Sequence, residues 1–541
     1  MALTGTDTSP ATLATTLAAV EAALWAADMA SAMQLSEDAV AAGAVHPTLL
    51  SLSALGRMHA GDNQAALPLL LRAREMTPQH VDLLNALGEC LTRLGRPREA
   101  VEAFDAALAI APEARLHFGR AMALEDLSAL DAARAGFEQA LALNPALSEA
   151  LARLALLAVQ RGDAAAGRDL ATRALAIDPR DAAARIALAQ AALEQKDMPT
   201  AEQIVSALVQ DRSLGAVNRA YALSLAGDIL DAQDRTAEAF AAYAASKASQ
   251  RDAYTPAMTG LEGVRARELR LADYFRRAPA WRGSAPPQAL RHVFLVGFPR
   301  SGTTLLEQVL ASHPDVAAMQ ERTCLMDSAA AFFGSDADLD RLAALSEAEL
   351  ESWRAAYWRR VAETEQPVSK PVFVDKMPLN AVFLPLIAKL FPQAKILFAL
   401  RDPRDVVLSC FRRRFAMNAG MVEFTALDTS VAYYVAVMAL IQVYRETLAL
   451  EIFEARHESL IADFEGEARR LCDFLELDFR DEMRAFADRA RAQNIDTPSS
   501  AQVARGLSDS GVAQWRRYLP QLQPVLAMLA PYVARFGYPE I

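Results

Sequence analysis

The sequence predicts two kinds of structure in one chain, an all-helical α-solenoid followed by an α/β domain built on a central parallel sheet. A period of 33 or 34 residues in the first half predicts the solenoid. Short apolar runs in the second half, each ending in glycine or charge, predict buried parallel strands. A chain of 541 residues is also too long for one core, so two or three domains are expected.

Composition limits the classes of function. A formal net charge of −12 argues against general nucleic-acid binding, which needs a basic surface. The four cysteines have no metal-ligand spacing and are expected to be buried or free thiols in a reducing compartment. The N-terminus has no basic segment ahead of its apolar stretch, and no later run is expected to be long and charge-free enough to span a membrane. We therefore expect a cytoplasmic protein without a membrane span.

The repeats are marked by prolines that recur at Pro78, Pro112, Pro145 and Pro179. Twelve residues before each proline stands a small residue, and five before each stands an alanine. Small residues at these offsets let two antiparallel helices approach closely, and the proline ends the second helix. The pattern resembles the tetratricopeptide repeat, with Phe104 and Phe137 at its usual aromatic position. We expect six or seven repeats over about residues 15–250.

A solenoid of this kind has a concave face on which a peptide or a partner protein can be held. The array can equally make the protein a homodimer or brace the second domain, and the sequence leaves these alternatives open. Helical sequence ends near Leu271, and three prolines between residues 279 and 287 indicate a stiff linker. The expected boundaries are repeats over residues 1–255, a linker over 256–289 and the α/β domain over 290–541.

The α/β domain begins with the stretch VFLVGFPRSGTT, residues 293–304. A strand, a glycine-bounded loop and a helix in this order direct N–H groups and a helix dipole at a bound anion. Gly297 and Gly302 have Walker-A spacing, but Thr303 replaces the expected lysine and Arg300 stands in the loop. Arg300 offers a planar fork for phosphate or sulfonate oxygens, whereas phosphoryl transfer from a Mg²⁺-nucleotide fits poorly. The loop predicts an anion site in a P-loop-like domain.

Three polar residues stand near the ends of later apolar runs. Glu321 could return toward the loop as a general base, although a lone acid is more often a surface group. Lys376 ends the run VFVDK and is one of six lysines in the chain, which indicates that a compact point charge is needed there. Arg401 follows the run ILFAL, at the sheet edge where open α/β sheets bind ligands, and Ser409 lies about two turns into the next helix.

Other charged residues in this half carry weaker signals. Asp375 is similar to a Walker-B acid, but without a P-loop lysine a Mg²⁺ role is not expected. The run Arg412–Arg414 adds positive charge, and at least two of its side chains are expected on a solvated face. Toward the C-terminus, the stretch SSAQV leads to Trp515, with Arg505 and Arg516 placed to close over a nucleotide phosphate.

Together these elements resemble the sulfotransferases that use 3′-phosphoadenosine-5′-phosphosulfate (PAPS), especially tyrosylprotein and bacterial repeat-fused sulfotransferases. The resemblance covers about residues 290–541. Its motifs are PRSGTTLLEQVLASHPDV, DKMP, KILFALRDPRDVVLS and SSAQV…W, in family order and spacing. One such motif would be suggestive, and the set is specific.

The resemblance implies a donor site and a catalytic set. The implied 5′-phosphosulfate loop is Arg300, Ser301, Gly302, Thr303 and Thr304. The implied 3′-phosphate pair is Arg401 and Ser409, with Arg505 or Arg516 as a further phosphate contact. The implied catalytic residues are Glu321 as base, Lys376 and Ser499 as the groups that stabilise the bridging oxygen and the sulfonate, and Arg300 of the donor loop. The positions that depart from the family pattern are His457, Gln514 and Gln320.

The sequence thus predicts metal-independent, in-line transfer of a sulfonate from PAPS to a hydroxyl acceptor, with adenosine 3′,5′-bisphosphate as product. A peptide tyrosine is the first expectation for the acceptor, while a carbohydrate or small phenol stays open. Residues Phe415–Tyr434 and Met326–Lys370 are candidate acceptor walls by position. The alternatives are a non-catalytic repeat adaptor with a degenerate nucleotide-binding domain, and a nucleotide kinase, which the missing P-loop lysine argues against.

Overall fold

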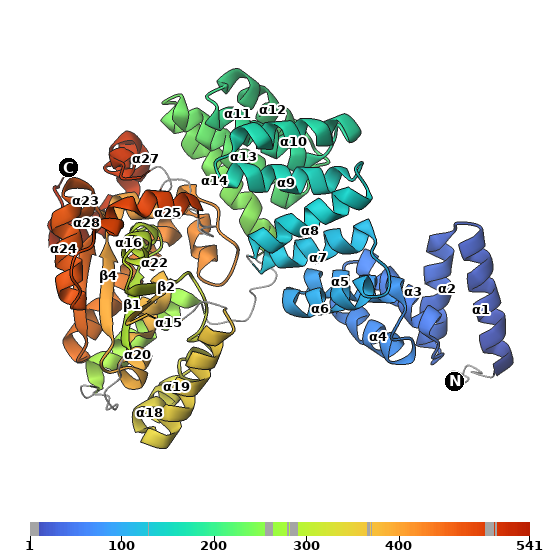
Figure 1. Cartoon of the computed structure of the whole chain (residues 1–541), viewed down its shortest axis with the longest axis horizontal. Helices are drawn as coiled ribbons and strands as arrows, with labels where there is room; N and C mark the ends of the chain where they lie inside the picture. Colours follow the sequence, from blue (N-terminus) through green and yellow to red (C-terminus); the bar gives the residue numbers. More distant parts are fainter. Residues whose placement is uncertain are drawn as a thin grey trace. The chain divides into compact units, whose positions relative to one another are not determined.

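The computed structural model describes residues 10–127, 129–254, 263–278, 281, 290–364, 368, 370–492, 503 and 506–540. The chain forms two compact units, Met1–Gln195 and Lys196–Ile541 (Figure 1). The second unit therefore begins inside the helical repeat region and includes its last helices.

The first unit consists of successive helices, each packed against the next, as expected for tetratricopeptide repeats. They are α1 (Pro10–Trp25), α2 (Met29–Ala41), α3 (Pro47–His59), α4 (Asn63–Met76), α5 (Val81–Arg93), α6 (Pro97–Leu108), α7 (Ala114–Asp126), α8 (Leu130–Leu143), α9 (Ser148–Gln160), α10 (Ala164–Ile177) and α11 (Ala182–Glu194). The small residues that mark the repeat are buried, among them Ala66, Ala100, Ala133 and Gly167. Phe104 fills the space beside two glycines, since a Cβ at Gly88 or Gly119 would lie within 2.7 Å of its ring.

The second unit starts with α12 (Met198–Gln210), α13 (Ala216–Ala232), α14 (Thr236–Tyr254) and α15 (Val264–Arg277). Its strands are β1 (Arg291–Gly297), β2 (Val316–Met319), β3 (Val372–Lys376), β4 (Lys395–Leu400) and β5 (Glu451–Arg456). The α-helices that follow β1 are α16 (Thr303–Ala311), α17 (Met326–Phe332), α18 (Asp336–Ala344), α19 (Glu347–Ala362), α20 (Leu384–Leu390), α21 (Pro403–Arg412), α22 (Leu427–Thr447), α23 (His457–Ala462), α24 (Phe464–Leu475), α25 (Phe486–Ala492), α27 (Leu519–Leu522) and α28 (Leu526–Arg535). The 3₁₀ segments are η2 (Pro378–Phe383), η3 (Met421–Thr425), η4 (Asp481–Ala485), η5 (Asp509–Gly511), η6 (Gln514–Tyr518) and η7 (Gln523–Val525).

The strands form one sheet in the order β2-β3-β1-β4-β5, with every pair parallel, as the sequence predicted. Alternate residues of β1 face two different cores. Phe294 and Val296 pack with α15, α21, α22 and α28, while Val293 and Leu295 pack with α16, α24 and α25. The sheet is therefore the middle of three layers, and the carboxyl ends of its strands lie along one edge.

Helix α22 corrects one expectation about the chain. By length and composition it could cross a membrane, so the expectation that no run is long and charge-free enough was wrong. However, most of the helix is buried inside the structure, where Val431, Val437 and Leu440 pack in the larger core on one face of the sheet. Burial in this core accounts for its apolar composition. The four cysteines are buried and free, as expected.

Asp375 and Lys376, adjacent in β3, face opposite sides of the sheet. Asp375 is fully buried and accepts a hydrogen bond from the Tyr357 hydroxyl at 2.7 Å, on the face away from α16. His292 Nε2 lies 3.0 Å from the same hydroxyl. Burial raises the pKa of Asp375 to about 7, because the ionised carboxylate loses its hydration there. Asp375 therefore belongs to a buried network in the core and points away from the anion loop.

We expect Phe104→Ala to lower the free energy of unfolding by about 3–5 kcal/mol, because it empties a space that two glycines leave for the ring. Leu143→Ala is the matched control, since Leu143 also lies in a repeat helix but is half exposed, and its effect should be within about 1 kcal/mol. Urea denaturation followed by circular dichroism measures both. Equal losses from the two variants would contradict this account of the repeat packing.

We expect Asp375→Asn to change how stability depends on pH. The pKa of Asp375 is higher in the folded than in the unfolded protein, so its contribution to stability is complete below about pH 4 and is lost as the pH rises through 7. Between pH 5 and 7 the wild type should lose up to about 1.4 kcal/mol per pH unit relative to the variant. Urea midpoints followed by tryptophan fluorescence at several pH values test this, and parallel pH profiles would refute it.

Candidate active site

The glycine-bounded loop lies between β1 and α16, and its backbone is unusual. Arg300 adopts a positive φ of 72°, in the left-handed region that side-chain-bearing residues seldom occupy, and Gly302 follows at 96°. Gly302 is the N-cap of α16, and no side chain of the described residues caps that helix. The first N–H groups of α16 are therefore directed at the loop, in the arrangement that binds anions.

Arg300, Arg401 and Ser409 come together behind this loop. Arg300 Nε donates to Ser409 Oγ at 3.0 Å, and Arg401 Nη1 donates to the carbonyl oxygen of Arg300, also at 3.0 Å. Both guanidinium groups are buried, with less than a tenth of either residue exposed. Burial lowers the pKa of Arg300 to about 9, and the charges of Arg413 and Arg401 act in the same direction. Positive charge is thus concentrated in a buried place, where a bound anion would relieve the repulsion.

Two buried nitrogens beside the loop have no hydrogen-bond partner among the described residues, Nε of Arg401 and Nδ1 of His457. His457 follows the last residue of β5, and a Cβ on Gly302 would lie 2.7 Å from its Nδ1. Burial lowers the pKa of His457 to about 3, with Arg401 and Arg300 acting the same way, so the ring is neutral near pH 7. The structure therefore places His457, a departure from the family pattern, directly against the anion loop.

Lys376 ends β3 and is completely buried between two carboxylates. Its Nζ lies 3.0 Å from Glu321 Oε1 and 3.1 Å from Glu307 Oε2. Burial alone would lower the pKa of Lys376, but Glu307 and Glu321 together hold it above its ordinary value. Glu321 follows β2 by two residues and is about one-third exposed, so the pair reaches from the sheet to the surface.

Sequence reasoning missed Glu307, a buried acid in α16. Every residue of that helix is buried, and burial raises the pKa of the Glu307 carboxyl, which the charge of Lys376 opposes. Gln308 Nε2 also donates to Glu307 Oε1 at 3.2 Å. A single ionisable residue in a helix of apolar and neutral residues is the signal that could have identified it, because such groups are rarely buried unless paired.

The remaining predicted residues divide into three groups. Ser301, Thr303 and Thr304 are buried in the loop and the first turn of α16. Arg516 is exposed, and its guanidinium lies 4.9 Å from the Trp515 ring. Ser499 and Arg505 fall outside the described residues.

The solvated face expected for Arg412–Arg414 is wrong. Arg412 is mostly buried and forms an ion pair with Asp231 of α13, and Arg414 lies 3.6 Å from the ring centroid of Tyr221 in the same helix. Arg413 Nη1 lies 4.0 Å from Asp228 Oδ1, also in α13. The run ends α21 where helices α13 and α14 pack, and sequence spacing could not show acids from so distant a segment.

The candidate residues lie beyond the carboxyl ends of neighbouring strands. Arg300 follows β1, Lys376 ends β3 and Arg401 follows β4, and β1 pairs with both of the other strands. A buried cationic loop next to a lysine held by two acids can bind an anion and stabilise negative charge that develops beside it.

Both parts of the chain are similar to known proteins. A model described as the sulfotransferase family matches residues 292–481, and tetratricopeptide repeat models match residues 52–114, 93–148 and 158–223. A putative protein-tyrosine sulfotransferase of Caenorhabditis briggsae is 24% identical over 250 residues, which cover 46% of this chain and 88% of that protein. Human protein-tyrosine sulfotransferase 1 is 25% identical over 258 residues, which cover 46% of this chain and 69% of that protein.

An uncharacterized protein of Aquifex aeolicus is 30% identical over 261 residues, 46% of this chain, but the match spans only 34% of that protein. The sequence motifs, the parallel sheet with its anion loop, and the family matches all support the same assignment. The chain carries tetratricopeptide repeats followed by a domain of the sulfotransferase family.

Proposed function

We propose that the protein transfers a sulfonate group from PAPS to a hydroxyl acceptor and releases adenosine 3′,5′-bisphosphate. One observation carries this proposal: two groups of residues lie at the ends of adjacent strands. The first group is Arg300, Arg401 and Ser409, and the second is the ion pair of Lys376 and Glu321. The first group suits a phosphorylated, sulfonated nucleotide, and the second supplies an acid–base pair next to it.

The donor fits the buried groups of the loop. Arg300 and the N-terminus of α16 would hold the 5′-phosphosulfate, while Arg401 and Ser409 would hold the 3′-phosphate. Arg401 Nε and His457 Nδ1, which have no hydrogen-bond partner among the described residues, could make further contacts to phosphate oxygens. The donor brings the activated sulfur–oxygen bond, and these side chains bind and orient it.

The chemical step divides between Glu321 and Lys376. Glu321 accepts the proton of the acceptor hydroxyl as that oxygen bonds to sulfur, and the bond from sulfur to the bridging phosphate oxygen breaks. Lys376 stabilises the negative charge that grows on the departing oxygen. When Glu321 takes up the proton it loses its charge, and Glu307 remains as the counter-ion that keeps Lys376 in place.

A peptide tyrosine is the acceptor we propose, on the basis of the named relatives of Caenorhabditis briggsae and human. The repeats would then hold the peptide or its parent protein, because arrays of this kind present a concave surface for such segments. Carbohydrates and small phenols are the competing acceptors, and an acceptor screen separates them.

We expect Lys376→Met and Glu321→Gln each to lower the rate of sulfonate transfer by about two to four orders of magnitude, by analogy with the loss of one oxyanion donor or general base. Transfer of ³⁵S from labelled PAPS to a pool of tyrosine peptides measures this. Lys395→Met is the matched control, because Lys395 starts β4 at the opposite end of the sheet and pairs with Glu476. Wild-type rates in the first two variants would contradict the assigned chemistry.

We expect Ser409→Ala to weaken the binding of adenosine 3′,5′-bisphosphate about tenfold, which corresponds to one hydrogen bond to a charged group. Titration calorimetry in EDTA measures the dissociation constant. Ser312→Ala serves as control, because Ser312 lies at the opposite end of α16 and its hydroxyl donates to the carbonyl oxygen of Gln308 in the same helix. An unchanged affinity in Ser409→Ala would remove Ser409 from the donor site, and no binding by folded wild type would favour the adaptor alternative.

A further inference from the structure

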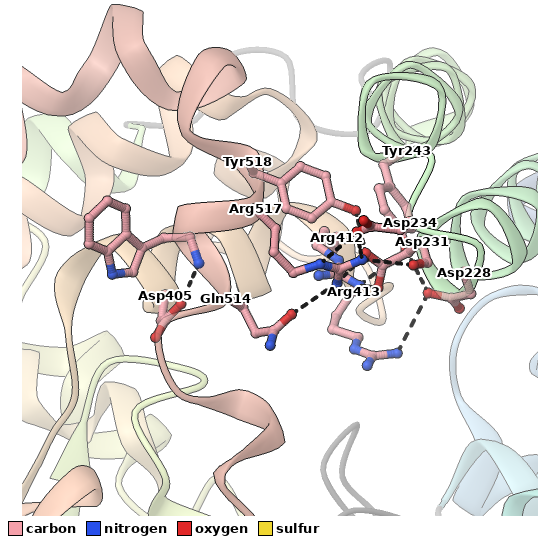
Figure 2. Close-up of polar contacts among 11 residues, drawn as sticks. Asp228, Asp231, Asp234, Tyr243, Asp405, Arg412, Arg413, Gln514, Arg517 and Tyr518 are labelled. Carbon is pink, nitrogen blue, oxygen red and sulfur yellow. Dashed lines mark hydrogen bonds and ion pairs between the residues drawn. The ribbon is translucent and has the colours of Figure 1, made fainter.

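Asp231, in the repeat helix α13, is mostly buried and accepts from three side chains of the sulfotransferase-family domain and the segment after it. Arg412 donates to its Oδ2, while Arg517 Nη1 and the Tyr518 hydroxyl donate to its Oδ1 at 2.8 and 2.7 Å. Figure 2 shows these three side chains converging on Asp231. A carboxylate with charged partners at both oxygens fixes their geometry far better than one exposed ion pair does.

Other contacts strengthen the same junction. Arg517 Nη2 also donates to the Asp231 carbonyl oxygen and to Asp234, and its Nη1 donates to Gln514 Oε1. Arg412 lies over the rings of Tyr243 and Tyr518, 5.2 and 5.1 Å from their centroids. Gln514 thus accepts from the same nitrogen of Arg517 that donates to Asp231 (Figure 2).

Helix α14 holds the same end of α21. The buried Lys247 donates from Nζ to the carbonyl oxygen of Arg413 at 2.5 Å, just past the C-terminus of α21. Phe240 packs against Phe411 with ring centroids 4.9 Å apart. The last residues of α21 are thus fixed by both α13 and α14.

The two segments joined at Asp231 are α21 and η6. Helix α21 carries one residue of the proposed PAPS site, and η6 lies close in sequence to a contact of another. Helix α21, which ends in Arg412, supplies Ser409 to Arg300. Segment η6, which contains Arg517 and Tyr518, begins three residues after Gly511, whose carbonyl oxygen accepts from Arg401 Nη2. At its other end, α21 holds η6 through Asp405, whose carboxylate accepts from the N–H groups of Ala513 and Trp515. Helix α21 and segment η6 are therefore held together at both ends of α21, by Asp405 at its N-terminus and by Asp231 at its C-terminus.

We propose that Asp231 is a positioning residue for the donor site, so that helices α13 and α14 of the repeat region form part of the transfer machinery. This inference rests on the proposed function. Asp231 does not contact the loop itself, and it acts by holding Ser409 and Arg401 at their places through Arg412, Arg517 and Tyr518.

The test uses the full chain and the variants Asp231→Asn and Asp234→Asn. Asparagine keeps the size of the side chain but removes the charge. Asp234 is the matched control because its side chain is 82% exposed and its carboxylate pairs with Arg517 alone among the described residues. Amide hydrogen exchange should become at least about tenfold faster in α21 and η6 for Asp231→Asn, with α12 and β1 unchanged as internal references. Asp234→Asn should speed exchange by less than about twofold, because an exposed ion pair contributes little to stability.

Binding of adenosine 3′,5′-bisphosphate completes the test, with an expected loss of about tenfold in Asp231→Asn and a smaller loss when Ser409→Ala is already present, because both act through α21. Unchanged exchange in α21 and η6, or faster exchange with unchanged affinity, would overturn the inference. If Asp231→Asn does not fold, Tyr518→Phe removes one donor alone and should speed exchange in η6. Failure of the wild type to bind would defeat the proposed function, while exchange would still show whether Asp231 holds the two segments.

Discussion

The hydrogen bond from Arg401 to the carbonyl oxygen of Arg300 is the contact on which the candidate site depends. It ties the end of β4 to a loop residue held in a left-handed conformation, and the Arg300 side chain in turn contacts Ser409 of α21. Strain of this kind persists only where the surroundings enforce it, and it is found at functional sites. The parallel sheet provides those surroundings, because β1 lies between β3 and β4 and brings three strand ends together.

The fold was predictable where local pattern carries the information. Buried parallel strands are continuous apolar runs, and glycine or charge marks their ends, so β1, β3 and β4 were visible with Arg300, Lys376 and Arg401 beside them. Strand β5 was not, because it is an edge strand whose sequence EIFEAR alternates with charge. Glu307 was missed because one acid in an otherwise uncharged helix shows no partner until the fold places Lys376 next to it.

Contacts between segments far apart in the sequence could not be predicted from the spacing of residues. Arg412 and Asp231 are 181 residues apart and Arg517 and Asp231 are 286 apart, so composition could only suggest that the arginine run faces solvent. In the structure, acids of α13 pair with Arg412 and Arg413, and Tyr221 of the same helix covers Arg414. The division of the chain at Lys196 follows the same logic, because the last repeat helices bury their charges against the domain that follows them and form one compact unit with it. The repeat region thus contributes both to the first unit and to the framework of the candidate site.

The central claim is that the cationic loop recognises a nucleotide with phosphate groups at both the 5′ and 3′ positions. The most direct measurement compares the dissociation constants of adenosine 3′,5′-bisphosphate and adenosine 5′-monophosphate for the unmodified full chain. A second phosphate placed at Arg401 and Ser409 gains charge-assisted hydrogen bonds, so the bisphosphate should bind at least about tenfold more tightly. Equal affinities would show that the buried arginines do not bind the 3′-phosphate, and would contradict the proposed recognition of a 3′,5′-bisphosphate nucleotide.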